Sequence, residues 1–423
     1  SYFQWFAMTR TRVSATASRV VIGGQSLPVY GDALPFTLGN AEVRGRVLWL
    51  DDPTDTSVDI RGRIVAARLR APDPARIRTT TNSADVRYAT AAITATQGAL
   101  LRRRPAAVLL VADATTDGAF DDLSTLRSRG VYDVDRAAGR FATQPYRLAP
   151  VAATPNASPA VVLVRAAMGE QLARGPEVEL VLGVERFETP SPNIVGTIRG
   201  TDPTLRDEYV LFSSHQDHDG VRYVIDGDSV WAGADDNGSG SVALLAAARA
   251  FAKQPGLRSA LFVYHGAEER GLLGSRYHAA HPVVPLERIV AVLNAEMIGR
   301  NHPDSASLLG IQPPHRNSAD LVEHALRANE RTGRFALDSL WDRPTHPEGW
   351  YFRSDHVPYA RLNVPAVMFT TNLHADYHTP RDKPERIDYA KLTRMTQWLY
   401  LTGWYVANAP ARPRLDAAFR LER

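Results

Sequence analysis

Residues 209–215 read YVLFSSH, QDHDG follows at 216–220, and AGADDNGSG occupies 232–240. The first run is mainly apolar and has the length of a buried strand. Histidine and aspartate side chains set among glycines come directly after it. Such a cluster is poorly suited to a hydrophobic core, because unpaired charges are costly to bury, and it is well suited to a metal site. A metal site here needs further ligands from elsewhere in the chain.

A repeated pattern of strand, loop and helix begins at this stretch. Apolar runs predict strands at 209–214, 259–265, 288–296 and 364–370. Helical stretches separate or follow them at 240–253, 271–280, 318–330 and 389–407. This alternation predicts an α/β fold with a mainly parallel, mixed central sheet and helices on both faces.

Residues 38–175 differ from the rest of the chain in their pattern of predicted strands and in composition. Short β-rich runs at 43–50, 59–69 and 106–113 accompany a predicted helix at 84–104 and a strand–helix pair at 159–172, and the segment contains no histidine. We expect a smaller, β-rich α/β domain inserted there, with residues 1–37 and 176–423 forming the larger domain. Because the chain opens directly in a strand pattern, we also expect earlier elements before Ser1.

Composition narrows the class of protein. Of the 423 residues, 44% are hydrophobic and 22% are charged, as in an ordinary globular protein. There is no cysteine, so disulfides and thiolate sites are excluded and a metal must bind His, Asp or Glu. The net charge of +3 comes without interleaved basic and aromatic residues, which argues against a nucleic-acid partner. No apolar run has the length of a membrane span, and the sequence does not specify an oligomeric state.

Each of the four strands predicted from residue 209 onward is associated with a candidate metal ligand. His215 follows the first strand, the pair Glu268–Glu269 follows the second, Glu296 ends the third and His378 follows the fourth. In open α/β sheets, ligands bind at the carboxyl ends of the strands. We therefore expect these side chains to meet at one edge of the sheet.

Simpler explanations exist for most of these acids taken singly. Asp235 and Asp236 could cap the helix that begins near residue 238. The pair Glu268–Glu269 could open a solvated helix, where acids suit the helix dipole. Glu296 is harder to explain in this way, since a carboxylate that ends the run IVAVLNAE needs a partner. The ordered set as a whole favours the metal site.

Six short motifs follow one another along the chain: H-x-D-H-x-G, G-A-D-D-N-G-S-G, G-A-E-E-x-G-L-L-G-S, N-x-E-M-I-G-R, R-S-D-H-x-P and D-Y-H-T-P-R-D. This set closely resembles the bacterial zinc aminopeptidases with two co-catalytic metals, relatives of aminopeptidase Y and glutamate carboxypeptidase II. Residues 38–175 resemble the protease-associated domain that many members carry as an insertion. The resemblance covers essentially the whole chain. It implies a phosphorylase/hydrolase-like zinc exopeptidase fold, peptide substrates and a secreted or periplasmic location.

The resemblance implies five ligands for two divalent metal ions, expected to be Zn2+: His215, Asp236, Glu269, Glu296 and His378. Asp236 would bridge the two ions and be followed by a cis peptide bond. His215 and Glu296 would complete one site, and Glu269 and His378 the other. Many members have aspartate where this chain has Glu296, so the geometry at this ligand is expected to differ. His218 and Asp219 fall outside the implied ligand set.

The resemblance also implies residues that act around the metals. Glu268 would be the general base, and Tyr377 would polarise the substrate carbonyl. Asp217 would accept a hydrogen bond from His215 and so fix its tautomer. The remaining candidates behind the ligands are Asp235, Asp355 and His356.

The hypothesis for the reaction is hydrolysis of an N-terminal peptide bond by a metal-bridged hydroxide. Two ions about 3.5–4 Å apart can lower the pKa of a water held between them. Glu268 would take the proton of that water and later hand it to the leaving amine, while Glu269 stays bound to metal. Two other activities stay open. A carboxypeptidase or dipeptidase of the same fold could use Arg353 to hold the terminal carboxylate, and a catalytically inactive relative would be a binding scaffold.

Overall fold

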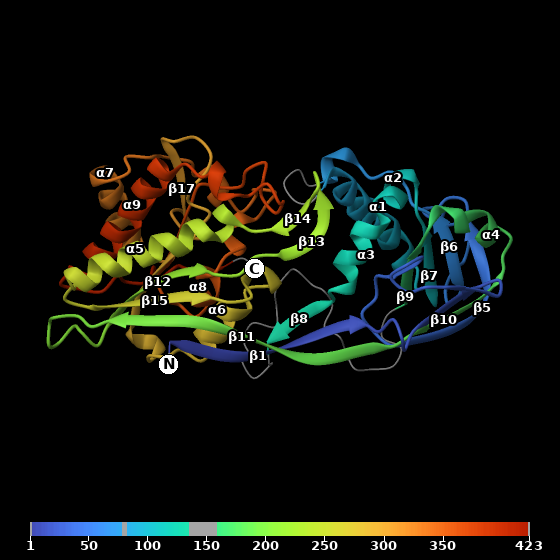
Figure 1. The fold of residues 1–423 in the computed structure, drawn as a ribbon, viewed down its shortest axis with the longest axis horizontal. Helices are drawn as coiled ribbons and strands as arrows, with labels where there is room; N and C mark the ends of the chain where they lie inside the picture. Colours follow the sequence, from blue (N-terminus) through green and yellow to red (C-terminus); the bar gives the residue numbers. More distant parts are fainter. Residues whose placement is uncertain (1, 78–82, 135–158, 422–423) are drawn as a thin grey trace.

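The computed structural model describes residues 2–77, 83–134 and 159–421. Residues 78–82 and 135–158, which belong to the expected inserted domain, lie outside this part. The described chain builds two large sheets, each with helices packed on it (Figure 1). Two long antiparallel strands, β1 (Phe3–Val13) and β11 (Val184–Ile198), extend from the larger sheet toward the smaller one.

In the described residues, the larger sheet has nine strands, with four parallel strands at its centre and antiparallel pairs on both sides of them. From one edge to the other, the order is β18 (Ala336–Leu337), β17 (Ser305–Leu309), β19 (Ala366–Thr370), β16 (Ile289–Glu296), β12 (Tyr209–His215), β15 (Ser259–His265), β11, β1 and β8 (Val131–Val134). The central strands β19, β16, β12 and β15 run parallel. The pairs β17–β19, β11–β15, β1–β11 and β1–β8 are antiparallel. The expected mixed α/β sheet is confirmed, with parallel strands at its centre and one further parallel pair, β17–β18, at an edge.

Alternate residues of the central strands face different helix layers, because side chains alternate across a strand. Val210 and Phe212 belong to the core that is covered by α5 (Gly240–Lys253), α7 (Ala319–Arg331) and α9 (Tyr389–Asn408). Leu211 belongs to a second cluster, which is covered by α6 (Leu273–Ala280) and α8 (His356–Arg361). The two helix layers lie on opposite faces of the sheet (Figure 1). Within the described residues, no helix has both the length and the apolar character that a membrane span requires.

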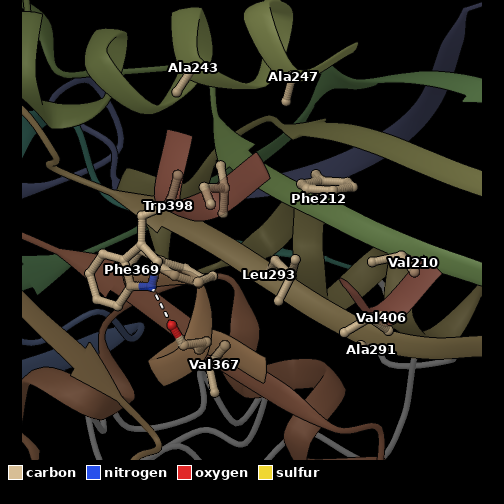
Figure 2. Packing of buried hydrophobic residues seen from close by; sticks show 14 of the residues in the cluster. Val210, Phe212, Ala243, Ala247, Ala291, Leu293, Val367, Phe369, Trp398 and Val406 are labelled. Carbon is tan, nitrogen blue, oxygen red and sulfur yellow. Dashed lines mark hydrogen bonds between the residues drawn. The ribbon is translucent and has the colours of Figure 1, made fainter. Parts of the chain in front are cut away.

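Trp398 anchors the core beneath α9 (Figure 2). Its indole is fully buried, lies edge-on to the ring of Phe369 with centroids 4.7 Å apart, and donates its N–H to the carbonyl of Ala325 at 2.7 Å. Burying an aromatic side chain of this kind contributes roughly 1.5–3 kcal/mol. The satisfied indole N–H avoids the penalty of an unpaired buried donor.

The smaller sheet extends beyond the expected boundaries of 38–175. Its order is β3 (Gln25–Leu27), β2 (Arg19–Ile22), β10 (Glu177–Leu182), β5 (Ala41–Leu50), β6 (Ile64–Arg68), β7 (Ala107–Val111), β9 (Ala160–Val164) and β4 (Ala33–Pro35). Its helices are α1 (Ala84–Leu101), α2 (Ala114–Gly118), α3 (Phe120–Ser128) and α4 (Gly169–Ala173). Strand β2 pairs with β10 from the far side of the insertion, so both belong to this sheet. The boundaries are predicted from a change in the local residue pattern, which carries no information about such a long-range pairing.

A hairpin between the two motifs that open the candidate site connects the two halves of the molecule. β13 (Gly220–Ile225) and β14 (Asp228–Trp231) form it, and Tyr223 and Trp231 are buried in the core of the smaller sheet. At its base, the Asp219 carboxylate pairs with Arg129 from the smaller domain at 3.3 Å and with Arg270 at 3.1 Å. The stretch from His215 to Asp236 is therefore held from both domains.

Candidate metal centre

The parallel strands bring the expected ligands to one edge of the larger sheet. β12 ends at His215 and β16 ends at Glu296. The turn after β15 carries Glu268 and Glu269, and the loop after β19 leads to His378. Because β19, β16, β12 and β15 are neighbours in the sheet, residues far apart in sequence meet at their carboxyl ends.

The first group of candidate ligands consists of His215, Asp236 and Glu296. The Nε2 atom of His215 lies 3.1 Å from Oδ1 of Asp236 and 3.3 Å from Oε1 of Glu296. All three side chains are buried. Burial alone would lower the pKa of His215, but the carboxylates of Glu296 and Glu268 raise it well above its usual value. The negative potential that holds a proton here would equally favour a bound cation.

The second group contains Asp236, Glu269, His378 and one residue that the expected ligand set left out, His218. The Nε2 atom of His378 lies 3.1 Å from an oxygen of Asp236 and 3.1 Å from an oxygen of Glu269. The Nδ1 atom of His218 lies 2.7 Å from the other oxygen of Glu269. Each of the four residues offers one donor atom within 4.8 Å of the others.

Asp236 is shared by the two groups through its two oxygens. Its Oδ1 faces His215 in the first group, and its Oδ2 faces His378 in the second. The side chain is buried, and burial alone would raise its pKa, as would the nearby Glu269 carboxylate. The imidazoles of His215 and His378 nevertheless hold the pKa of Asp236 well below its usual value. This is the arrangement that a carboxylate bridging two metal ions requires.

The loop that presents Asp236 is held by a residue to which the sequence assigned no role. The carboxylate of Asp382 accepts hydrogen bonds from the backbone N–H groups of Asp235 and Asp236, at 3.0–3.1 Å. Gly233 precedes the loop in the left-handed region, with φ of 68°. The peptide bond between Asp236 and Asn237 is cis, as the resemblance implied.

Glu296 is held in place from two sides. Ser354 donates its hydroxyl to Oε2 of Glu296 at 2.5 Å, and the amide of Asn237 donates to the same oxygen at 3.2 Å. Asn294 in turn donates its amide to the Ser354 hydroxyl at 2.6 Å. Oε1 therefore faces His215 while Oε2 is satisfied by protein groups, which is how the longer glutamate side chain is accommodated at this position.

Asp235 lies behind the ligands and belongs to neither group. Its Oδ1 accepts the backbone N–H of Gly299 at 2.7 Å, and its Oδ2 lies 3.3 Å from Nε2 of His374. The side chain is completely buried, so these contacts fix its orientation. The capping explanation fails for Asp235, because neither carboxylate oxygen accepts from the start of α5 and the N–H of Gly240 donates instead to Asn237.

Asp217 has a different role from the one expected. Its backbone carbonyl, and not its carboxylate, pairs with Nδ1 of His215, at 2.9 Å. The nearest carboxylate oxygen is 4.0 Å away from that nitrogen. The carboxylate instead accepts the backbone N–H groups of Glu268 at 3.0 Å and Glu269 at 3.3 Å. Asp217 therefore orients the His215 ring with its main chain and the glutamate turn with its side chain.

Glu268 stands beside the ligand groups without joining either. Its Oε2 lies 3.9 Å from Nε2 of His215, whereas Glu269 belongs to the second group. In the ion-free protein, burial raises the pKa of Glu268 well above its usual value. A buried carboxyl with a raised pKa next to a metal site has the position and the chemistry of a proton acceptor.

Tyr377 stacks on His378, with ring centroids 3.9 Å apart. Its hydroxyl oxygen accepts a hydrogen bond from Nη2 of Arg353 at 2.9 Å, which leaves its O–H available to donate. Burial raises the pKa of Tyr377 well above its usual value, so the hydroxyl stays protonated. Arg353 also donates to Glu348 at 2.8 Å.

Asp355 and His356 follow Ser354 and are both completely buried. Burial raises the pKa of Asp355 to about 7, with Glu296 and Asp217 adding to the effect of burial. His356 turns away, with its ring edge-on to that of Tyr351 at 4.7 Å. Asp355 therefore lies within electrostatic reach of the candidate ligands, and His356 takes part in packing.

The donor set fits zinc. Both groups offer only imidazole nitrogens and carboxylate oxygens, which suit zinc among the divalent ions. Nε2 of His378 and Oε1 of Glu269 are buried without a hydrogen-bond partner among the described residues. Buried polar atoms normally have a hydrogen-bond partner. Nitrogen and oxygen atoms that lack one and converge on one point therefore indicate a position for a bound ion. The ligands expected from the sequence and His218 together make up the two groups.

The larger sheet thus gathers two histidine–carboxylate groups around one shared aspartate, with Glu268 beside them, an arrangement chemically suited to metal-assisted hydrolysis. The family model described as Peptidase family M28 matches residues 193–402. That segment is slightly less than half of the chain and contains both ligand groups, so the similarity to this family includes the candidate metal centre. The match begins after the smaller sheet, so the resemblance of residues 38–175 to a protease-associated domain stays a prediction.

Two relatives identified by sequence similarity are named aminopeptidases. The chain is 30% identical over 239 residues to Aminopeptidase YwaD from Bacillus subtilis, covering 55% of this chain and 48% of that protein. It is 35% identical over 196 residues to an aminopeptidase from Pseudomonas aeruginosa, covering 44% and 32%. The chain thus spans about half the length, or less, of these two relatives.

Two solved structures share the fold. BSAP, a zinc aminopeptidase from Bacillus subtilis, superposes with a TM-score of 0.53 at 18% identity, covering 97% of this chain and 86% of that one. An aminopeptidase from Aneurinibacillus sp. strain AM-1 gives 0.52 at 17%, covering 98% and 87%. At these identities the likeness concerns the fold.

Proposed function

We propose that this protein is a dinuclear-zinc aminopeptidase, which hydrolyses the N-terminal peptide bond of peptides. The observation that carries the proposal is Asp236, whose two oxygens face two separate ligand groups. Glu268 lies next to these groups and is not part of either. Two metals with a free carboxylate beside them are the requirements of metal-assisted hydrolysis. The match of residues 193–402 to the model of Peptidase family M28 and the similarity to named aminopeptidases support the choice of substrate.

The chain's own residues supply proton transfer and orientation. Bound zinc ions would polarise the peptide carbonyl and lower the pKa of a nearby water. Glu268 takes the proton of the attacking water and passes it to the leaving amine. Asp217 holds the turn that carries Glu268 through the backbone N–H bond at 3.0 Å. Tyr377 donates its free O–H to the oxygen on which negative charge develops, which stabilises the transition state.

The contacts of Arg353 favour an aminopeptidase over a carboxypeptidase. A carboxypeptidase would need a cation free to bind the substrate's terminal carboxylate. Arg353 is already engaged by Glu348 at 2.8 Å and by the Tyr377 hydroxyl at 2.9 Å. Its guanidinium also lies over the ring of Trp350, 5.0 Å from the centroid. Arg353 therefore acts as a support for Tyr377.

A substrate comparison tests the proposal. Zinc-loaded protein should hydrolyse amino-acid anilides and free-amine dipeptides, and it should leave N-blocked dipeptides intact. Removing zinc with a chelator should abolish the activity, and adding zinc back should restore it. Hydrolysis of N-blocked dipeptides at comparable rates would overturn the aminopeptidase assignment. Activity that survives complete removal of metal would overturn the metallohydrolase assignment.

A further inference from the structure

We propose that His218 is a fourth protein ligand of the metal ion held by Asp236, Glu269 and His378, and that the two metal positions are therefore unequal. The inference rests on the proposed dinuclear function and adds a ligand and an order of metal loading to it. The ion at the four-ligand position is the tightly held one. The ion at the three-ligand position is the exchangeable one.

The position of the His218 ring carries the first part of the argument. Nδ1 lies 2.7 Å from Oε1 of Glu269 and 3.9 Å from Oδ2 of Asp236. The ring is edge-on to that of His378, with centroids 5.3 Å apart. The side chain is only 4% exposed, so it has been brought to the site and does not point to solvent. One donor atom from each of the four residues can therefore reach a common ion.

The simpler explanation is that His218 only orients Glu269 by a hydrogen bond. The angles at this short contact do not favour it. Both ring nitrogens of His218 and Oε1 of Glu269 lack a partner with hydrogen-bond geometry, as does Nε2 of His378. Atoms that are close together but not aligned as donor and acceptor are expected where each directs a lone pair at the same cation. Ligation uses these atoms, whereas an orienting hydrogen bond does not account for their directions.

The backbone around His218 is built to hold the ring in this place. A Cβ atom at Gly233 would lie 2.4 Å from Cγ of His218, so only glycine leaves room for the imidazole. The next residue, Asp219, is held by Arg129 at 3.3 Å and by Arg270 at 3.1 Å. Arg129 belongs to the smaller domain and also donates to the backbone carbonyl of Asp219 at 3.1 Å. The smaller domain thereby helps to position a residue of the metal centre.

The number of protein ligands then decides which ion is exchangeable. Zinc sites with four protein ligands are closed and structural, whereas sites with three keep a position open for water or substrate. The first group, His215, Asp236 and Glu296, has three. Glu268 lies on the side of this group, 3.9 Å from His215. The open position and the proposed base therefore occur together, as catalysis requires.

X-ray absorption spectroscopy on the unaltered protein tests ligation and loading order together. Protein freed of metal is given one equivalent of zinc, and the imidazoles bound per zinc are counted. The proposal expects two, from His218 and His378. A count of one would overturn it, because either position without His218 has a single histidine. A count midway between one and two would overturn the inequality, because the zinc would then be spread over both positions.

Variants add a readout of affinity. For His218→Ala, the tighter of the two zinc-binding steps, measured by calorimetry, should weaken by more than the roughly 10-fold to 100-fold expected for losing an outer hydrogen-bond partner. His218→Asn keeps a donor near Glu269 but removes the imidazole, so it should be equally weak. Recovery of wild-type affinity by His218→Asn would overturn the proposal in favour of an orienting hydrogen bond. His302→Ala, which removes an exposed imidazole, is the matched control and should bind zinc as the wild type does.

Failure of the proposed function would look different. A protein that binds fewer than two zinc ions, or that lacks aminopeptidase activity with two bound, contradicts the dinuclear aminopeptidase and not the role of His218. If His218→Ala does not fold, as judged by circular dichroism, the imidazole count on the unaltered protein decides the question alone.

Discussion

Replacing Glu268 by glutamine would remove the proposed base and leave the shape of the site intact. The two side chains have nearly the same volume, so neither a cavity nor a steric clash is introduced. Glu268 belongs to neither ligand group, and its carboxylate is 3.9 Å from the nearest imidazole nitrogen, that of His215. The backbone N–H bond that fixes the turn to Asp217 does not involve the substituted atoms. We therefore expect both metal positions to fill as in the wild type.

The expected loss is in turnover. Positioned general acid–base groups contribute about 10²-fold to 10⁴-fold to the rate. At about 1.36 kcal/mol per tenfold, this corresponds to about 2.7–5.4 kcal/mol of transition-state stabilisation. Because the base acts on the water and not on the bound peptide, kcat and kcat/KM should fall together while KM changes little.

Steady-state hydrolysis of an amino-acid anilide measures kcat and KM, and elemental analysis of the same sample measures metal content. Glu269→Gln is the matched control, since the neighbouring residue is a candidate ligand. It should bind fewer than two equivalents of zinc. Glu268→Gln should retain two and lose activity. The pair of variants separates a role in proton transfer from a role in binding metal.

Two outcomes would contradict the assignment of Glu268. If Glu268→Gln keeps a near wild-type kcat with both ions bound, Glu268 is not the base. If it loses metal to the same extent as Glu269→Gln, its carboxylate is a ligand, and the roles of the two neighbouring glutamates have to be revised.

Three further predictions concern the shell of the site, its protonation and the core. Ser354→Ala removes the 2.5 Å hydrogen bond to Glu296 and should weaken zinc binding by roughly 10-fold to 100-fold in calorimetry. In the ion-free protein, burial would lower the pKa of His378, but the carboxylates of Glu269 and Asp236 outweigh burial and raise this pKa to about 10. Zinc must therefore displace a proton from His378, and the affinity for zinc should rise as the pH increases from 6 to 9. In thermal melts, the stability of the ion-free protein should fall as the pH rises through about 10. Trp398→Ala should lower the free energy of unfolding by about 3–5 kcal/mol, measured in urea.

The fold of the larger domain could be predicted because its signals are local. Each buried strand is a continuous apolar run, and each helix has its own amphipathic or apolar stretch. The predicted strand at 259–265 coincides with β15, and the predicted helix at 240–253 coincides with α5. The smaller domain was less predictable at its edges. Strands β2 and β3 form a local pair, but they are joined to the rest of the sheet by the pairing of β2 with β10, more than a hundred residues later, and no local pattern indicates that pairing.

The sequence also predicts most of the side chains that the structure brings together at the candidate site. What it does not predict are the individual atoms in contact and the contributions of distant segments. The rule that ligands gather at the carboxyl ends of parallel strands is enough to place His215 and Glu296 at the same edge of the sheet. The rule cannot say which atom of Asp217 faces His215, and the structure shows the carbonyl. Nor can it place Asp382, whose carboxylate holds the loop of Asp236 from a distant segment.

The amino-acid sequence determines the class of fold and the residue types available to a metal. It also determines the order along the chain of the strands that carry the candidate ligands. These properties depend on periodicity and on residues adjacent in the chain. The direction of the His218 side chain, in contrast, is set by tertiary contacts, because its ring position depends on Gly233 and on the arginines that hold Asp219. Such contacts between distant segments orient a side chain in a loop, and local sequence does not encode them.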